Sequence, residues 1–330
     1  MKTFANTNAR SPQDAASRAA QARKAGQTAV FAGGGSDVLQ LVKDHIVTPD
    51  VIVNLKTMSN LNQVTKAGAT ISIGGQTTLD ALGRHEMIRK DYAVLAEAAD
   101  TVATPQIRNV GTIAGNVAQR PWCWYYRNGF QCYKNGGNQC FSFAGENQFH
   151  AIFGGGPSYI VHPSDIAPAL VALGATFRVV GPGGERKVPA SEFFVLPRQN
   201  AARENILAED ELVASIELPV AKPGTRSRYY KVMDRETWTH AVVSAAVVLE
   251  MDQQICRSAR VVLGGVAPVP WRLQAVEEML TGQRITEELA ARAAEASVTG
   301  ARALSKNAYK IPMTKAVVRR TLLETVQQKA

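Results

Sequence analysis

Three consecutive glycines, Gly33-Gly34-Gly35, restrict the fold most, because they stand between a predicted strand and a predicted helix. The strand is the apolar run Thr28–Ala32, and the helix is expected over Val38–Lys43. Glycine lets backbone N–H groups approach anionic oxygens closely, and a helix N-terminus adds a favourable dipole. A tight turn whose polar residues cap the helix explains the same pattern. The dinucleotide fingerprint G-x-G-x-x-G fails, because its third glycine would fall at Val38.

Strands and helices alternate on both sides of this loop. Alanine-rich helical spacing predicts a helix over residues 12–25, and apolar periodicity predicts two more over 79–87 and 91–102. Strands are predicted over 51–55 and 70–73. This alternation is typical of an α/β unit.

A second glycine-containing segment, Thr104–Asn116, is predicted to be a loop from its Pro, Gly and Asn content. Its end, Gly111–Asn116, is about 80 residues from the first loop and has a similar character, although a tight turn explains it equally well. A third polar turn, His162–Asp165, precedes a predicted helix over 165–173 and a strand over 176–180. Together the three turns predict a site for a large cofactor that contains a diphosphate.

The pattern changes after a linker-like stretch at residues 219–225. Residues 228–234, 241–250 and 257–263 are predicted strands of an antiparallel sheet, and helices are expected over 276–280, 287–301 and 315–327. The length of 330 residues exceeds what one core usually supports, which favours two or three domains. We place a boundary near residue 222.

The net charge of +9 is spread along the chain and is not interleaved with aromatic residues, so nucleic acid is not an expected partner. No run of about 20 apolar residues predicts membrane insertion. The first 17 residues lack the charged-then-apolar pattern of an export signal.

Three of the four cysteines, Cys123, Cys132 and Cys140, fall within 18 residues of an irregular segment. Their spacing matches neither the zinc pattern of paired cysteines nor the ferredoxin run. A chain of this size does not need disulfides, so the clustering favours a metal or redox role, while incidental cysteines remain an alternative. Cys256 is expected to be a buried small apolar residue.

The sequence resembles a known family at several positions. AGGGSD at 32–37 and IRNVGTIAGN at 107–116 resemble the two FAD-binding signatures of the medium subunit of the xanthine dehydrogenase and carbon monoxide dehydrogenase family. HPSD at 162–165 and YYKVMDRETWTHAVVSAAV at 229–247 resemble the same family. The resemblance covers essentially the whole chain and implies an α+β fold. A two-lobed FAD-binding domain of the vanillyl-alcohol oxidase type would span residues 1–222, with a cysteine-containing insertion at about 118–158. A C-terminal α/β domain with an antiparallel sheet would span 223–330.

The resemblance also implies an FAD site. Ala32 to Ser36 and Thr112 to Asn116 would surround the pyrophosphate, Asp165 would bind toward the adenosine end, and Lys231 would lie near the flavin. The implied cofactor residues are Ala32, Gly33, Gly34, Gly35, Ser36, Asp37, Ile107, Thr112, Ala114, Gly115, Asn116, Asp165 and Lys231. Ala114 departs from the family, which commonly has Gly there. No catalytic residue is implied, and no flavin-attachment motif is present, so non-covalent FAD is expected.

The pattern RPxCWYYR around Cys123 resembles the aldehyde oxidoreductase branch, which carries an additional [4Fe-4S] cluster in its flavin subunit. The resemblance implies that Cys123, Cys132 and Cys140 are cluster ligands. Ser158 stands where a fourth cysteine is expected, so the fourth ligand is Ser158, His150 or absent.

The function implied is electron transfer within a molybdenum hydroxylase. Electrons from a molybdenum-cofactor subunit would pass through a small [2Fe-2S] subunit to FAD on this chain and then to an external acceptor. Two alternatives are a stand-alone flavin oxidase of the same wider fold and a cysteine-based interaction module without flavin. The expected location is the cytoplasm, or the periplasm if a partner's signal exports the complex.

Overall fold

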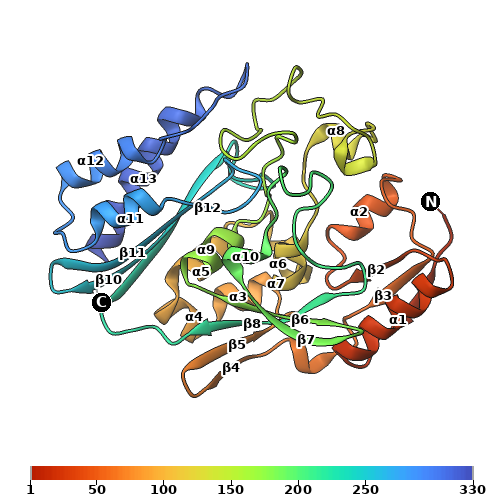
Figure 1. Ribbon diagram of the computed structural model, residues 1–330. Helices are drawn as coiled ribbons and strands as arrows, with labels where there is room; N and C mark the ends of the chain where they lie inside the picture. The colour runs from red at the N-terminus through yellow and green to blue at the C-terminus, as the bar shows by residue number, and fades with distance from the viewer. Residues whose placement is uncertain (1, 329–330) are drawn as a thin grey trace.

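The computed structural model describes residues 2–328, which form three β-sheets (Figure 1). The first sheet is parallel, in the order β1 (Ala5–Asn8), β3 (Val51–Asn54), β2 (Ala29–Ala32). The crossover between β1 and β2 is α1 (Pro12–Lys24), as predicted, and its buried alanines allow close packing against β3. The sheet ends at the first glycine loop and α2 (Val38–Lys43).

The second sheet has five strands, all paired antiparallel, in the order β4-β5-β8-β6-β7. Their bounds are β4 (Val64–Ala67), β5 (Thr70–Gly74), β6 (Thr176–Gly181), β7 (Gly184–Pro189) and β8 (Leu212–Pro219). The main core lies between this sheet and its helices. Those helices are α3 (Leu79–Arg84), α4 (Glu86–Asp91), α5 (Ala93–Asp100), α9 (Ile166–Ala172) and α10 (Ala190–Phe193).

The prediction of a loop over residues 104–116 is wrong, because this segment forms two short helices. These are α6 (Pro105–Val110) and α7 (Ile113–Ala118). Each begins at a threonine whose hydroxyl accepts a hydrogen bond from the backbone, Thr104 from Ile107 and Thr112 from Gly115. Such caps stabilise helices too short to show an apolar period.

The C-terminal sheet is antiparallel, as predicted, in the order β12 (Trp271–Arg272), β11 (Ile255–Gly264), β10 (Val243–Asp252), β9 (Thr225–Val232). Strand β10 is apolar on both faces: residues 245, 247, 249 and 251 face one core, and residues 246 and 248 face the other. Helices α11 (Gln274–Leu280), α12 (Glu287–Ala296) and α13 (Lys310–Gln327) cover the first face. Helices α5 and α9 of the preceding domain cover the second, so the two domains share a core.

The insertion between α7 and α9 is mostly irregular, as predicted, apart from α8 (Trp124–Arg127) and a short 3-10 turn, η2 (Tyr133–Asn135). Figure 1 shows it in yellow-green at the top, between the first lobe and the C-terminal helices. Asn147 fastens it to the C-terminal segment through Ser305 (3.0 Å) and the amide of Lys306 (2.9 Å). Within residues 2–328 no helix has the length and apolar character needed to cross a membrane.

The two-sided packing of β10 generates a prediction. Leu249→Ala should lower the free energy of unfolding by about 2–5 kcal/mol, because the side chain is fully buried in the C-terminal core. Leu39→Ala is the control, since that side chain is 44% exposed and its loss should cost about 0.5 kcal/mol. Denaturant titration measures both, and equal losses would contradict this account of the core.

Candidate cofactor site

The first glycine loop presents unpaired backbone donors. Within residues 2–328, the amides of residues 33–36 donate no hydrogen bond to another backbone group. Gly35 has φ +77°, a left-handed conformation that favours glycine. Several free N–H groups in one turn form an anion-binding concavity. The loop therefore has the chemistry that a diphosphate needs.

The second glycine segment packs directly on the first. A Cβ added to Gly34 would fall on the backbone carbonyl of Val110. One added to Gly33 would lie 2.9 Å from the hydroxyl of Thr112. The sequence predicts glycine here for the approach of phosphate oxygens, whereas at Gly34 the immediate neighbour is the other loop. Gly34 is thus required for the two loops to meet.

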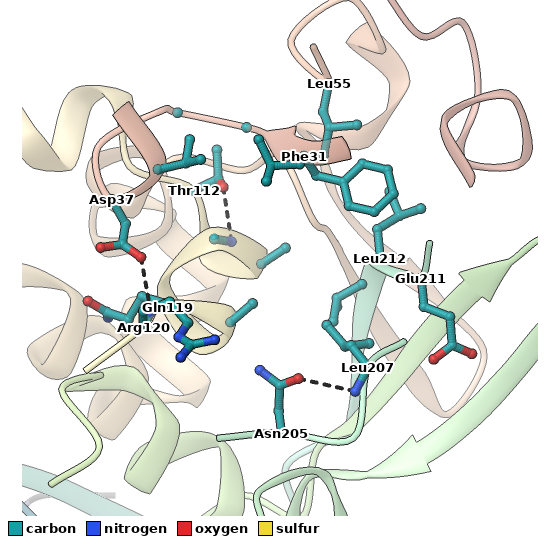
Figure 2. A pocket seen from close by; sticks show the side chains of 18 of the residues that line it. Phe31, Asp37, Leu55, Thr112, Gln119, Arg120, Asn205, Leu207, Glu211 and Leu212 are labelled. Atoms are coloured by element: carbon teal, nitrogen blue, oxygen red, sulfur yellow. Dashed lines mark hydrogen bonds between the residues drawn. The ribbon is translucent and has the colours of Figure 1, made fainter. Parts of the chain in front are cut away.

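A cavity of about 370 Å³, here called the first cavity, lies beside both loops (Figure 2). Its wall combines loop residues 33–38, Thr112 with the α7 residues Ala114 and Gly115, and residues 203–205, 207–209 and 211–213. Phe31 and Leu55 add apolar surface. The buried Oε1 of Gln76, which also lines it, has no hydrogen-bond partner within residues 2–328. An orphaned polar atom of this kind indicates a missing ligand group.

Two more cavities continue from the loops on their other side. The second cavity, about 290 Å³, shares Ser36, Thr112 and Gly115 with the first. Ile107 and Asn116 line it, as does Asp165. The third cavity, about 260 Å³, shares Trp122 and several neighbours with the second and reaches Cys123. The three cavities form one trough that passes over both glycine loops.

Asp165 and Lys231 do not lie at opposite ends of this trough. Lys231 Nζ is 2.7 Å from Asp165 Oδ2, and both side chains are almost fully buried. The carboxylate also accepts a bond from the Tyr229 hydroxyl, and the ammonium donates to the carbonyls of Thr101 and Thr239. Because the two residues are in contact, they lie at the same end of the site, so the predictions that Asp165 is at the adenosine end and Lys231 near the flavin cannot both hold. Asp165 lines the second and third cavities, so the ion pair belongs to that end.

His240 places an acceptor nitrogen in the same end of the trough. Its Nδ1 donates to the carbonyl of Pro163 (3.4 Å), so Nε2 carries the lone pair, and the residue lines the second and third cavities. Burial lowers the pKa of His240, which keeps the ring neutral. The centroid of the His240 ring lies 5.2 Å from that of the Trp122 ring. The Arg127 guanidinium lies 4.3 Å from the centroid of the same Trp122 ring.

Asp37, implied by the resemblance as a cofactor residue, uses its carboxylate inside the protein. Oδ1 is 2.7 Å from the guanidinium of Arg127, and Oδ2 accepts from the Arg120 amide at 3.0 Å, the bond drawn in Figure 2. The side chain lines the trough, but its charge is already paired. Its role is to hold the first glycine loop against the insertion.

The three clustered cysteines meet around one small cavity, here called the cysteine cavity. It encloses about 10 Å³ and is lined by Cys123, Cys132, Cys140, Ser142 and Ser158. The thiols are free, and Cys140 Sγ accepts from the Tyr159 amide at 3.5 Å. Within residues 2–328, no three Cys, His, Asp or Glu side chains are placed to hold a single metal ion.

His150 lies outside the cysteine cavity, with Nε2 3.4 Å from Cys123 Sγ, and lines the third cavity. Burial lowers the pKa of His150 to about 4 and raises the pKa of the Cys123 thiol to about 11. The Cys123 thiol is therefore protonated at neutral pH. Cys256 is buried in the C-terminal core, as expected.

Several lining residues were missed from the sequence. They include Gln76, Trp122, Trp238, His240 and most of the segment 203–211. Gln76 and the segment 203–211 stand in no motif, so no local pattern distinguishes them. Trp122 directly precedes Cys123, and Trp238 and His240 lie within the 229–247 stretch that resembles the family, so a motif did give a signal at these three positions.

Comparison with known proteins extends over both domains. Residues 4–221 match the family described as FAD binding domain in molybdopterin dehydrogenase, and residues 228–325 match the CO dehydrogenase flavoprotein C-terminal domain. The chain is 32% identical over 335 residues to the aldehyde oxidoreductase FAD-binding subunit PaoB of Escherichia coli (strain K12), covering 99% of this chain and 100% of that protein. It is 27% identical to the carbon monoxide dehydrogenase medium chain of Hydrogenophaga pseudoflava, covering 83% and 79%.

The fold has solved counterparts. A structure of carbon monoxide dehydrogenase from Hydrogenophaga pseudoflava superposes with a TM-score of 0.77 at 25% identity and covers 98% of this chain and 96% of that one. Quinoline 2-oxidoreductase from Pseudomonas putida 86 has the same fold, with a TM-score of 0.76 at 23% identity. The predicted family resemblance and the predicted fold class are confirmed.

The contact between the glycine loops generates a prediction. Gly34→Ala should lower FAD affinity at least about tenfold, because its methyl group would push Val110 away and separate the amides from the second loop. Gly183→Ala is the matched control, since nothing lies within 4 Å of its added Cβ. Flavin fluorescence measures the affinity, and wild-type binding by the Gly34 variant would remove the loop contact from the site.

Proposed function

The chain belongs to the family of FAD-binding flavoprotein subunits of molybdopterin dehydrogenases, and we propose that it is the electron-transfer subunit of a heterotrimeric molybdenum-dependent aldehyde oxidoreductase. The observation that carries the proposal is the trough over two apposed glycine loops with unpaired amides. The full-length similarity to an aldehyde oxidoreductase FAD-binding subunit supports the substrate class. The partners proposed are a large molybdenum-cofactor subunit and a small [2Fe-2S] subunit.

FAD fits the trough in one direction better than in the other. The pyrophosphate would lie on the amides of residues 33–36 and on the N-terminus of α7. We place the isoalloxazine ring in the second and third cavities, because Trp122 and His240 offer ring surfaces there and Cys123 is close. The adenosine would then occupy the first cavity, beside Phe31 and Leu55. Flavin exchanges one or two electrons, which suits a relay between iron–sulfur centres and an external acceptor.

Residues of this chain surround the second and third cavities with groups that could respond to a change in charge on the isoalloxazine ring. The Lys231–Asp165 pair is buried and hydrogen-bonded on all sides, so it adds fixed dipoles at that end of the trough. His240 Nε2 offers an acceptor for an N–H of the ring. Within residues 2–328, neither glycine loop places a nucleophilic side chain beside a general base. This fits a subunit that transfers electrons and leaves the substrate chemistry to its partner.

One FAD per chain, bound without a covalent bond, is the expected composition of the native protein. Acid or heat denaturation should release all the flavin into the supernatant, because no attachment motif is present. Absorption at the flavin bands of supernatant and pellet measures this. Flavin that stays in the pellet would contradict the non-covalent site, and a protein without flavin would favour the interaction module.

Aldehyde oxidation should require the partner subunits. The isolated chain, loaded with FAD, should show no aldehyde-dependent reduction of an artificial acceptor, whereas the co-purified complex should turn over. The control is reduction of the bound flavin by dithionite, which tests that the isolated flavin is redox-active. Robust turnover by the chain alone would favour the stand-alone flavin oxidase.

We also propose that the cysteine cavity holds an iron–sulfur cluster, [4Fe-4S] or readily converted to [3Fe-4S]. The supporting observation is that three thiols and the Ser158 hydroxyl line one cavity, and that the amide of Tyr159 donates to Cys140 Sγ. Thiolate is the usual ligand of such clusters. Ser158 is the better candidate for the fourth ligand, because His150 lines a different cavity. A serine oxygen is a weaker ligand than a thiolate, so one iron should be labile.

Ser158→Cys should therefore make the cluster more resistant to air. Anaerobically prepared wild type should contain at least about three irons per chain, and air should generate a [3Fe-4S] signal in electron paramagnetic resonance that is reduced in the variant. His150→Gln is the control, because His150 does not line the cavity. An iron-free wild-type chain would overturn the cluster, and a sensitivity that follows His150 would reassign the fourth ligand.

A further inference from the structure

A buried ion-pair network joins the cysteine insertion to the wall of the first cavity. Lys134 Nζ lies 2.7 Å from Glu204 Oε1, and their side chains are only 1% and 3% exposed. Arg120 Nε lies 3.1 Å from the other oxygen of Glu204, and its guanidinium donates to the carbonyl of Lys134 at 3.2 Å. We call these three residues the Lys134 bridge.

The two ends of the Lys134 bridge lie in different parts of the site. Lys134 stands between Cys132 and Cys140 in the chain and lines the cysteine cavity, but none of the three trough cavities. Glu204 stands in the segment 203–213 that lines the first cavity. Lys134 Nζ also donates to the carbonyl of Arg203 at 2.9 Å. A single side chain of the insertion thus holds both the backbone and the carboxylate of the cavity wall.

The cost of this arrangement argues for a positional role. Burial lowers the pKa of Lys134, against the opposing effect of Glu204. Replacing a buried ion pair by apolar residues is often neutral or stabilising, so such a pair is poor evidence of stability. It does fix geometry, because each partner left alone is a buried charge. The segment 203–209 has no helix or strand of its own, and its backbone pairs with residues 193–195 through an isolated β-bridge between Asn205 and Phe194.

The insertion holds the opposite wall of the first cavity as well. Arg127 pairs with Asp37 at 2.7 Å, immediately after the first glycine loop. The Arg127 side chain is 8% exposed and also donates to the carbonyls of Arg120 and Pro121. The glycine loop and the segment 203–209 are therefore both tied to the segment 120–134, one on each side of the cavity.

We propose that Lys134 and Glu204 are positioning residues for FAD, through which the cysteine insertion sets how tightly the cofactor is retained. The proposal rests on the proposed placement of FAD in the first cavity. The insertion orders the wall that the cofactor contacts, although Lys134 itself does not reach the trough. Coupling of this kind is reciprocal, so bound FAD must in turn order the insertion. The coupling runs through protein side chains and operates whether or not the cysteine cavity holds iron.

The experiment measures FAD affinity and stability together, in the full chain purified with its partner subunits. Lys134→Met should weaken FAD binding at least about tenfold, because Glu204 loses its partner and the wall shifts. Lys187→Met is the matched control: it breaks an exposed Lys187–Glu217 pair of the same 2.7 Å length outside the cavities and should leave FAD affinity unchanged. A variant that melts earlier but binds FAD as wild type does would reduce the bridge to a stability element and overturn the proposal.

Two further measurements keep the test valid if Lys134→Met fails to fold. Glu204→Asp keeps the charge but shortens the side chain, so it should weaken FAD binding without leaving an unpaired lysine. In the wild type, adding FAD should slow hydrogen exchange of the amides in residues 130–141, which line none of the trough cavities. Unchanged exchange there would overturn the coupling. A wild-type chain that binds no FAD would instead refute the proposed function.

Discussion

The contact between Gly34 and the carbonyl of Val110 is the constraint on which the rest of the site depends. It brings the loop that follows β2 of the parallel sheet, here the first lobe, against the helical segment α6–α7, which belongs with the five-stranded sheet, here the second lobe. Only a residue without a side chain allows that approach. The unpaired amides of residues 33–36 and the N-terminus of α7 converge because of it. A diphosphate site built this way belongs to neither lobe alone, which explains why both glycine segments are needed.

The sequence predicted those elements whose conformation depends mainly on residues close together in the chain. The turn at the glycine triplet, the alanine-rich α1 and the antiparallel strands of the C-terminal sheet are of this kind, and the structure confirms them. Strand β8 was missed, although its apolar run packs at the centre of the second sheet. The helices α6 and α7 were missed because their caps act within one turn. The paired position of Asp165 and Lys231 was not predictable, since 66 residues separate them and only the fold brings them together.

Buried charge organises this protein around the trough. The Lys231–Asp165 pair stands behind the ring surfaces at one end, and the Lys134 bridge stands behind the wall at the other. Both pairs involve residues that lie far apart in the sequence, so each ties separate segments to one geometry. A buried ion pair fixes the position of its partners because either partner left alone is an uncompensated charge in the interior. The Lys231–Asp165 pair ties strand β9 to the start of α9, and the Lys134 bridge ties the insertion to the irregular segment 203–209.

The shared core beneath β10 has a consequence for how such a chain is inherited. The predicted boundary near residue 222 looks like a point where a gene could be cut or joined. The apolar side chains of α5 and α9, however, are covered by residues 229, 246 and 262 of the C-terminal sheet. A fragment ending at the boundary would expose the apolar face of α5 and α9. A foreign domain attached there would have to cover that face as the C-terminal sheet does. Recombination at this linker is therefore expected to yield a folded chain only where both regions come from closely matched parents.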